Sequence, residues 1–484
     1  MKDLALQALD AVTRRGAIYA DVRVEHARDR HVGTKNGRVS ATLSSESMGA
    51  GIRVLRNGGW GFAASDDLSR EGLERTAALA CDIADASASA KKHDVILAPE
   101  DRYESIWESP CAIDPFAISV EQNIQALLAV DAELRHNPGV TLAEGSLIFT
   151  RRRQVFASTL GSLIDQTRTT TGAGYAAYSF REDEIQKRSY PNSFGGQHQL
   201  KGYELLDELR LLDNAPRIAE EAVALHSADK CPEGRFDLIL DSSQLGLQIH
   251  ESIGHPIELD RVLGSEANYA GMSFLTLDKL NALRYGSEIV NVVCDARLQH
   301  GPGLGTLAFD DEGVPAQSTQ VIRDGLFVGY MTSRETAAQI GQPRSNGTMR
   351  ADGWARLPLI RMTNVSLLPG ERSREEVFDV PYAIYMETNR SWSIDDKRYN
   401  FQFGCEIGWE IRNGKRTRML KNPTYSGIST EFWNSCVAIA DARHWTLWGV
   451  PNCGKGQPEQ VMGTGHGASP SRFRNVKIGS ADLS

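Results

Sequence analysis

The chain has 484 residues, of which 41% are hydrophobic and 24% charged, and its formal net charge is −9. This length exceeds what one hydrophobic core normally serves, so two or three domains are expected. The acidic balance argues against a nucleic-acid partner, which would need a basic patch or domain. The sequence contains no run of 18 apolar residues, which argues against a membrane span.

Cysteine usage and the N-terminal segment bear on the compartment. The seven cysteines are scattered, odd in number and free of any CxxC pair, so mostly buried thiols in a reducing compartment are expected. The first 15 residues have apolar side chains at helical spacing with charges between them, and they lack the continuous apolar core of a signal peptide. The sequence therefore predicts a cytoplasmic protein.

Residues 1–90 are predicted to form a small α/β domain. A helix over the first 15 residues should end at Gly16, which can adopt the left-handed cap conformation. Short β-prone pieces follow, and Asn57-Gly58 predicts a hairpin because this pair supports primed turns. A second helix is expected from Asp67 to about Ala86.

Residues 91–230 are predicted to form a middle α/β region. Its first twenty residues resemble a linker, and Ser119 with Gln122 forms a capping box at the start of a helix. Alternating segments between residues 140 and 179 indicate strands. Asp, Lys, Pro and Gly in 227–235 mark the most plausible domain boundary.

Residues 231–484 are predicted to be mostly β-structure. A strand over 236–240 leads into Asp241, which can cap a following helix, and later hairpins turn at Asp324-Gly325 and Asn413-Gly414. Many turns and few helices indicate a twisted antiparallel, barrel-like sheet that carries one catalytic helix. The expected fold class of the whole chain is therefore α+β.

The most informative segment is His250-Glu251-Ser-Ile-Gly-His255-Pro256. Neutral imidazoles are good zinc ligands, and a glutamate beside them can take a proton from water that the metal activates. The histidines are five residues apart, not four as in the zincin H-E-x-x-H, which separates them by roughly 140° on a regular helix. They can share a metal only if the helix is distorted or ends between them. Gly254 loosens that point, and Pro256 is expected to push His255 out of the α region. The alternative is a surface helix end with two solvated histidines.

A third ligand must come from elsewhere, because catalytic zinc usually has three protein ligands and one water. Cys453 is favoured since it lies in a glycine-rich loop with Lys455 nearby, and a cation beside a flexible backbone favours a metal-binding thiolate. His466, in another glycine-rich loop, ranks next. By residue type, the candidates are Glu258, Asp260, Cys294, His300, His444, Cys453 and His466.

Other polar segments have both structural and functional interpretations. The acidic segment 310–312 (Asp-Asp-Glu) precedes Gly-Val-Pro and is interpreted as a solvated turn, with a role in orienting substrate or a ligand as the alternative. If His466 is not a ligand, it is interpreted as a turn residue, with a contact to a ligand or to the substrate backbone as the alternative. Arg350, Trp354 and Arg361 receive no role, because core packing and surface pairing explain them equally well.

Several short segments accompany the motif in a fixed order: Gly51-Ile-Arg-Val-Leu55, Trp60-Gly-Phe-Ala-Ala-Ser-Asp-Asp67, Asp310-Asp-Glu-Gly-Val-Pro315, Asn346-Gly-Thr-Met-Arg-Ala-Asp-Gly353, Arg361-Met-Thr-Asn364, Leu368-Pro-Gly370 and Cys453-Gly-Lys-Gly-Gln457. Together with the H-E-x-x-x-H spacing, they resemble the TldD family (TldD/PmbA proteins), a group of cytoplasmic zinc metallopeptidases. The resemblance covers nearly the whole chain, and the shared order makes it strong although each piece is weak alone.

The resemblance implies that His250, His255 and Cys453 bind Zn²⁺ and that Glu251 is the general base. It implies an α/β N-terminal region and a C-terminal twisted antiparallel sheet that holds the site. It further implies a homodimer, or a heterodimer with a TldE/PmbA-type subunit that lacks the zinc motif. Unfolded or extended peptides would be the substrates. This chain carries all the metal residues and so resembles the active subunit, although the segment after His255 departs from some members.

Two other functions compete with a zinc-dependent peptidase. One is a metal-dependent amidase acting on a small acyl substrate, which the site chemistry alone cannot separate from a peptidase. The other is a non-catalytic regulatory or partner subunit, for example a modulator of DNA gyrase. That hypothesis predicts erosion of the motif, whereas Glu251 and the three metal residues are all present.

Overall fold

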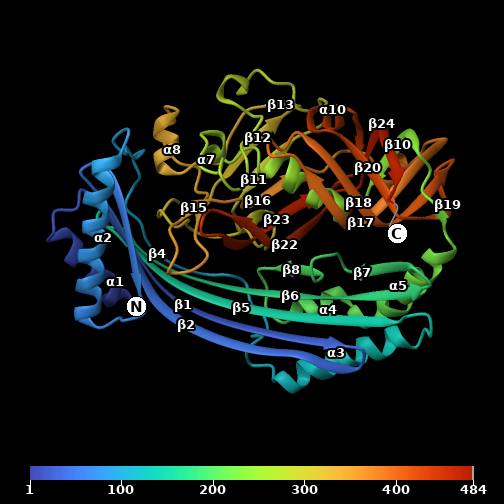
Figure 1. Ribbon diagram of the computed structural model, residues 1–484, viewed down its shortest axis with the longest axis horizontal. Coiled ribbons are helices and arrows are strands. Elements are labelled where there is room, and N and C mark those ends of the chain that lie inside the picture. Colours follow the sequence, from blue (N-terminus) through green and yellow to red (C-terminus); the bar gives the residue numbers. More distant parts are fainter. Residues whose placement is uncertain (482–484) are drawn as a thin grey trace.

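The computed structural model describes residues 1–481, except for the side chain of residue 300. A long curved sheet with helices on its outer side forms the lower layer in Figure 1, and a β-rich C-terminal half lies against its other face. No helix among the described residues is long and apolar enough to cross a membrane. The elements of the first half are α1 (Lys2–Thr13), β1 (Tyr19–Lys35), β2 (Arg38–Arg56), β3 (Gly59–Ser65), α2 (Arg70–Ala90), β4 (Glu104–Glu108), α3 (Val120–Arg135), β5 (Leu142–Ser158), β6 (Leu163–Arg181), β7 (Glu184–Tyr190), β8 (Gln197–Gln199), α4 (Glu204–Leu209) and α5 (Leu211–Ala224).

The lower sheet has the strand order β3-β2-β1-β5-β6-β4, with β7 and β8 also paired to β6. Its central strands run for 17 to 19 residues, where the sequence predicts short separate pieces. The turn at Asn57-Gly58 is confirmed, since both residues have positive φ angles of 51° and 74°. Ser119 and Gln122 form the expected capping box of α3. One sheet face packs against α1 and α2 at one end and against α3 and α5 further along.

The second half of the chain, from β9 onward, is β-rich, as expected. Its elements are β9 (Asp229–Lys230), β10 (Gly234–Leu240), α6 (Ser242–Ile249), α7 (Leu259–Val262), β11 (Val292–Asp295), β12 (Ser318–Arg323), β13 (Leu326–Phe327), α8 (Arg334–Gln339), β14 (Met349–Arg350), β15 (Leu359–Ile360), β16 (Asn364–Leu367), α9 (Arg374–Phe378), β17 (Tyr382–Ile394), β18 (Asn400–Arg412), β19 (Lys415–Lys421), β20 (Pro423–Ile428), α10 (Ser429–Asn434), β21 (Cys436–Ile439), β22 (Thr446–Lys455), β23 (Gln460–Ala468) and β24 (Ser471–Ser480). The hairpin turns at Asp324-Gly325 and Asn413-Gly414 are confirmed by positive φ angles at all four residues.

Five strands of this half form a closed barrel. They follow the order β17-β10-β24-β20-β18, and pairing of β17 with β18 completes the ring. The pairs are antiparallel except β10 with β17, which is parallel. A second, six-stranded sheet has the order β13-β12-β11-β16-β23-β22. The predicted α+β class with a barrel-like C-terminal region is therefore confirmed.

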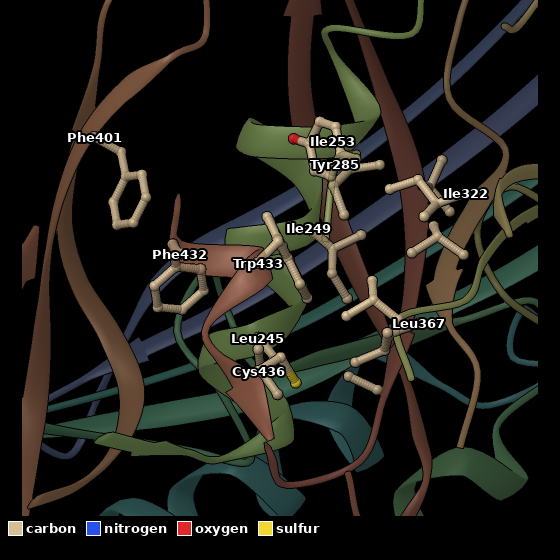
Figure 2. Packing of buried hydrophobic residues seen from close by; sticks show 14 of the residues in the cluster. Leu245, Ile249, Ile253, Tyr285, Ile322, Leu367, Phe401, Phe432, Trp433 and Cys436 are labelled. Atoms are coloured by element: carbon tan, nitrogen blue, oxygen red, sulfur yellow. The ribbon is translucent and has the colours of Figure 1, made fainter. Parts of the chain in front are cut away.

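Helix α6, which precedes the histidine motif, is buried between these two structures. Figure 2 shows Leu245 and Ile249 of α6 between Trp433 of α10 on one side and Ile322 and Leu367 of the six-stranded sheet on the other. All eight residues of α6 are buried. Because such a helix has no solvated face, the polar side chains at its C-terminal end must find partners inside the protein.

The acidic segment 310–312 is buried, so its interpretation as a solvated turn is wrong. The carboxylate of Asp310 accepts from the backbone N–H groups of residues 312, 314 and 349. Asp311 accepts from Gln154 on β5, and Glu312 forms a 3.0 Å ion pair with Arg53 on β2. The segment joins the C-terminal half to the inner face of the lower sheet.

Candidate metal centre

The histidine motif continues α6 as one widened helical turn. Asp241 caps the helix by accepting from the Ser243 N–H at 3.0 Å. Residues 250–254 form a π-helical turn, in which the His255 N–H donates to the His250 carbonyl at 3.1 Å. A turn closed from i to i+5 places residues five apart above one another, as the H-E-x-x-x-H spacing requires. The helix is thus distorted between the histidines, as expected.

The cause of this distortion differs from the expectation in one respect. His255 keeps α-helical angles, φ −65° and ψ −42°, although it precedes Pro256. The prediction that the proline drives His255 out of the α region is therefore wrong, and the wider turn supplies the adjustment. Gly254 matters for packing, because a Cβ atom there would lie 2.1 Å from the sulfur of Met362.

Three potential metal ligands converge at this turn. One ligand atom from each of His250, His255 and Cys453 lies within 4.8 Å of the others. His255 Nε2 is 3.8 Å from Cys453 Sγ, and the two imidazole rings are nearly perpendicular with centroids 4.8 Å apart. The three residues are 3%, 5% and 4% exposed. Cys453 lies on β22, next to a register shift after Val450, and not in the loop that its glycines suggest.

The other third-ligand candidates are engaged differently. Asp260 pairs with Lys455 at 2.7 Å, and the Cys294 thiol lies 2.9 Å from the Thr363 hydroxyl. His444 ends a short 3₁₀ helix, Ala442–His444, and the side chain of His300 lies outside the described residues. The two remaining candidates, Glu258 and His466, contact the motif histidines.

His466 fixes the tautomer of His250. Its Nδ1 lies 3.0 Å from the carbonyl oxygen of Val365, which can only accept, so Nδ1 carries the proton and Nε2 accepts. His466 Nε2 is 2.8 Å from His250 Nδ1, which must therefore donate. The Nε2 lone pair of His250 is left free for another partner. His466 is fully buried on β23, so its interpretation as a turn residue is wrong.

Glu258 orients His255 in the same way. Its Oε2 lies 3.1 Å from His255 Nδ1 and 3.3 Å from Arg261 Nε, and Lys455 Nζ is 3.5 Å away. Burial raises the pKa of Glu258, but the charge of Lys455, the hydrogen bond from His255 and the charge of Arg261 outweigh this effect and hold the pKa well below its ordinary value. An ionised Glu258 accepts the Nδ1 proton of His255, and Nε2 is again the free nitrogen.

The Cys453 thiol is placed to ionise. Burial raises its pKa, but the interaction with the His255 ring and then the positive charge of Arg361 outweigh this effect and lower the pKa from its ordinary value. Arg361 is fully buried and donates to the carbonyl oxygens of Cys453 and Gln460. A thiolate is the form of cysteine that binds metal.

Glu251 follows His250 in the motif turn, and one of its two carboxylate oxygens accepts a hydrogen bond. Arg398 Nη1, from the loop between β17 and β18, donates to Glu251 Oε2 at 2.9 Å. Arg398 is a non-glycine residue with a φ of +64°, an uncommon backbone conformation. The described residues provide no hydrogen bond for Oε1 of Glu251.

Sequence reasoning missed Arg398 and left Arg361 without a role. Arg398 lies 147 positions from Glu251 in a polar turn, and no spacing signal connects the two. Arg361 belongs to the segment Arg361-Met-Thr-Asn364, whose presence is informative although its contact with Cys453 is not readable from it. By residue type, Glu258 and His466 are candidate metal ligands. Their hydrogen bonds to the motif histidines cannot be predicted from the sequence, because they depend on three-dimensional packing.

Comparison with known proteins assigns the chain to one class, the metallopeptidases. Residues 233–480 match the family model described as "PmbA/TldA metallopeptidase C-terminal domain", and residues 20–84 match "PmbA/TldA metallopeptidase domain 1". The chain belongs to the TldD/PmbA family of metallopeptidases.

Individual relatives agree with this assignment. The chain is 28% identical to "Metalloprotease MJ0996" of Methanocaldococcus jannaschii, over 93% of this chain and 95% of the relative. It is 29% identical to "Zinc metalloprotease TldD homolog" of Saccharolobus solfataricus over 43% and 44% of the two chains. Among solved structures, a putative modulator of a DNA gyrase from Thermotoga maritima has a TM-score of 0.77 at 16% identity, covering 98% and 99%. TldE from Thermococcus kodakarensis has a TM-score of 0.73 at 14% identity, covering 98% and 100%. At these identities the two structures show the fold alone.

Proposed function

We propose that the protein is a zinc-dependent peptidase whose metal is held by His250, His255 and Cys453. Two imidazoles and a thiolate form a donor set that zinc accepts, with a fourth position left for water or substrate. The ligand atoms lie within 4.8 Å of one another, so small side-chain rotations suffice to bring them onto one ion. A relative at 29% identity that is named a zinc metalloprotease supports the choice of metal.

One observation carries this proposal: the free lone pairs of the buried triad face one another. Each imidazole donates its Nδ1 proton to a partner, His466 or Glu258, which leaves Nε2 as its unprotonated nitrogen. His255 Nε2 lies 3.8 Å from Cys453 Sγ, and one ligand atom of each residue lies within 4.8 Å of the others. Burying such lone pairs and a thiolate without a partner costs free energy, which a bound cation recovers. The arrangement therefore favours a metal over three inert core residues.

In the proposed reaction, Glu251 is the general base. Zinc in such a site supplies Lewis acidity, which activates water and polarises a carbonyl group. Arg398 holds Glu251 Oε2, so Oε1 is the atom that accepts the proton from water and later returns it to the leaving amine. The hydrogen bonds from His250 to His466 and from His255 to Glu258 keep both rings in place throughout.

Family membership supports our proposals for the substrate, the assembly and the compartment. We propose unfolded or extended peptides as substrates, and either a homodimer or a heterodimer with a TldE/PmbA-type subunit. The similarity of the fold to TldE is compatible with an assembly of two related chains. All seven cysteines are free thiols in the structure, which supports a reducing compartment, the cytoplasm.

The experiment is a digestion assay on the purified protein with an unfolded polypeptide and with a small N-acyl amide as alternative substrates. Mass spectrometry should show peptide fragments that disappear after chelation and return when zinc is added. Cleavage of the small amide alone would favour the amidase alternative. If the zinc-loaded protein cleaves neither substrate, with or without a TldE-type partner, the regulatory alternative is favoured.

A further inference from the structure

A cavity of about 300 Å³ lies between the lower sheet and the C-terminal half. One wall consists of β5 and β6, and the opposite wall includes β22 and β23, which lie above these strands in Figure 1. Four charged side chains line it, three positive and one negative: Arg152, Arg168, Arg350 and Asp352. His198 also lines it, but burial lowers the pKa of this histidine to about 4, so it adds no charge.

Two of the arginines are direct neighbours on adjacent strands of the lower sheet. Arg152 on β5 is the direct cross-strand partner of Arg168 on β6. Like charges directly opposite on antiparallel strands destabilise the pair. Arg152 has counter-ions, Glu25 at 3.3 Å and Asp29 at 3.5 Å. Within the described part of the chain, Arg168 forms neither a hydrogen bond nor an ion pair.

Arg350 adds a third positive charge from the opposite wall. It is only 4% exposed, and its two terminal nitrogens donate to the carbonyl oxygens of Met362 and Leu304. Its Nε atom is buried without a hydrogen-bond partner among the described residues. Burial, together with the charges of Arg168 and Arg361, lowers the pKa of Arg350 to about 9. The negative charge in the cavity, on Asp352, is already engaged, because its carboxylate accepts from the Val461 N–H at 3.0 Å.

This cavity adjoins the candidate metal centre. Met462, which lines the cavity, is the cross-strand partner of Cys453 in the β22–β23 pair. The backbone carbonyl of Met362 accepts from Arg350, and its sulfur packs against Gly254 of the motif turn. The negative charge of the Cys453 thiolate acts on Arg350. Met462 and Met362 therefore connect the cavity lining with Cys453 and with the motif turn.

We propose that this cavity binds a carboxylate of the peptide substrate through Arg168 and Arg350. Arg168 feels the charge of Glu25, but the direct ion pair of Glu25 is with Arg152, so Arg168 has no carboxylate in contact with it. An anion that contacts Arg168 would offset the repulsion from Arg152 and Arg350, and guanidinium groups bind carboxylates strongly. A peptide offers this chemistry at its C-terminus and on Asp or Glu side chains. The inference rests on the proposed peptidase function and adds the substrate feature that positions the chain near Cys453.

Binding by calorimetry tests the proposal without requiring cleavage. The zinc-loaded Glu251→Gln variant would be titrated with one unstructured peptide in three forms: free C-terminal acid, C-terminal amide, and amide with a glutamate side chain in place of the last residue. The free acid should bind at least about tenfold more tightly than the plain amide, as expected for a lost charged hydrogen bond. Recovery of the affinity by the glutamate-containing amide would identify an acidic side chain as a second source of the carboxylate.

Three substitutions locate the effect. Arg168→Gln should abolish the difference between acid and amide, and Arg168→Lys should retain most of it because the charge remains. Arg181→Gln is the matched control, since Arg181 lies on the same strand β6, is exposed and is outside the cavity. Circular dichroism would establish that each variant is folded.

The outcomes separate the two proposals. Equal binding of all three peptides, or an acid preference that survives Arg168→Gln, overturns the carboxylate site. Mass spectrometry of the peptides mixed with the parent protein reports hydrolysis independently. A carboxylate preference in binding without hydrolysis by the parent leaves the site standing and rejects the peptidase function.

Discussion

Two buried polar clusters in this protein differ in how their lone pairs are used. In the acidic segment 310–312, all six carboxylate oxygens are paired. The donors are backbone N–H groups, including that of Arg334, and the side chains of Gln154 and Arg53. In the metal centre, the Nδ1 atoms of His250 and His255 are hydrogen-bonded to His466 and Glu258. Neither of these two hydrogen bonds involves an Nε2 atom of His250 or His255. Burial is equally deep in both clusters.

The comparison teaches that buried titratable groups do not by themselves mark a functional site. A cluster whose acceptors are all paired holds the fold together, here by joining the lower sheet to the C-terminal half. A cluster that turns unpaired lone pairs towards one point is arranged for a ligand that is not protein. Substitutions in the metal centre should therefore lower activity or zinc binding, whereas substitutions that unpair the acidic segment 310–312 should lower stability.

Glu251→Gln should cause the largest change in activity. Without a general base, peptide hydrolysis should fall by about 100-fold to 10,000-fold. Zinc content should stay at the parent level, because Glu251 is not among the three ligands. Steady-state assays on metal-analysed protein would measure both quantities. Hydrolysis at the parent rate would remove Glu251 from the role of base.

Arg53→Met should cause the largest loss of stability. It leaves Asp21 and Glu312, which pair with Arg53 at 2.6 Å and 3.0 Å, as unpaired buried charges. The expected cost is about 3–5 kcal/mol in the free energy of unfolding, measured by denaturant titration. Arg56→Met is the matched control on the same strand. The ion pair of Arg56 with Asp85 is partly exposed and should contribute little to the free energy of unfolding. A similar loss in both variants would contradict a special role for the acidic segment.

His466→Phe should weaken the metal centre moderately. It removes the acceptor that fixes His250, so zinc affinity should fall by about 10-fold to 100-fold. Competition with a metal indicator would measure this change. The control is His226→Phe, another buried histidine, whose partners Glu184 and the Ser179 carbonyl lie outside the metal centre. Unchanged zinc affinity in His466→Phe would show that this hydrogen bond does not position a ligand.

A paired cluster on the barrel should give the smallest effect, and only in acid. Hydrogen bonds from Arg418 and Arg412 hold the pKa of Glu410 at about 2, below its ordinary value of 4.5. Because the folded pKa is the lower one, this stabilisation is present above about pH 4.5 and is lost as pH falls towards 2. Urea midpoints at pH 6 and pH 3 should therefore differ less in Arg418→Gln than in the parent. An equal difference would contradict the assignment.

The sequence predicts the local features of this fold well. Three hairpin turns are predicted correctly because their residues tolerate positive φ angles: Asn57-Gly58, Asp324-Gly325 and Asn413-Gly414. Ser119 correctly predicts the start of a helix. The spacing of His250 and His255 correctly predicts a distorted helix. These features depend on neighbours in sequence, which is why they are readable.

The features that the sequence does not predict depend on contacts between segments that are distant in the chain. The segment 310–312 resembles an exposed turn, and its burial depends on pairing with Arg53 on β2, with Gln154 on β5 and with backbone N–H groups. Cys453 and His466 have glycine neighbours typical of loops, but they lie on strands β22 and β23 of the six-stranded sheet. The closeness of Arg398 to Glu251 results from the β17–β18 loop reaching the motif turn.

Cobalt substitution would report whether His250, His255 and Cys453 share one metal ion. The cobalt-loaded protein should bind one ion per chain and show the near-ultraviolet charge-transfer band of a thiolate ligand. The band should vanish in Cys453→Ser and survive in Cys294→Ser, whose thiol lies beside Thr363. A parent protein without the band, or a band that persists in Cys453→Ser, would contradict the account.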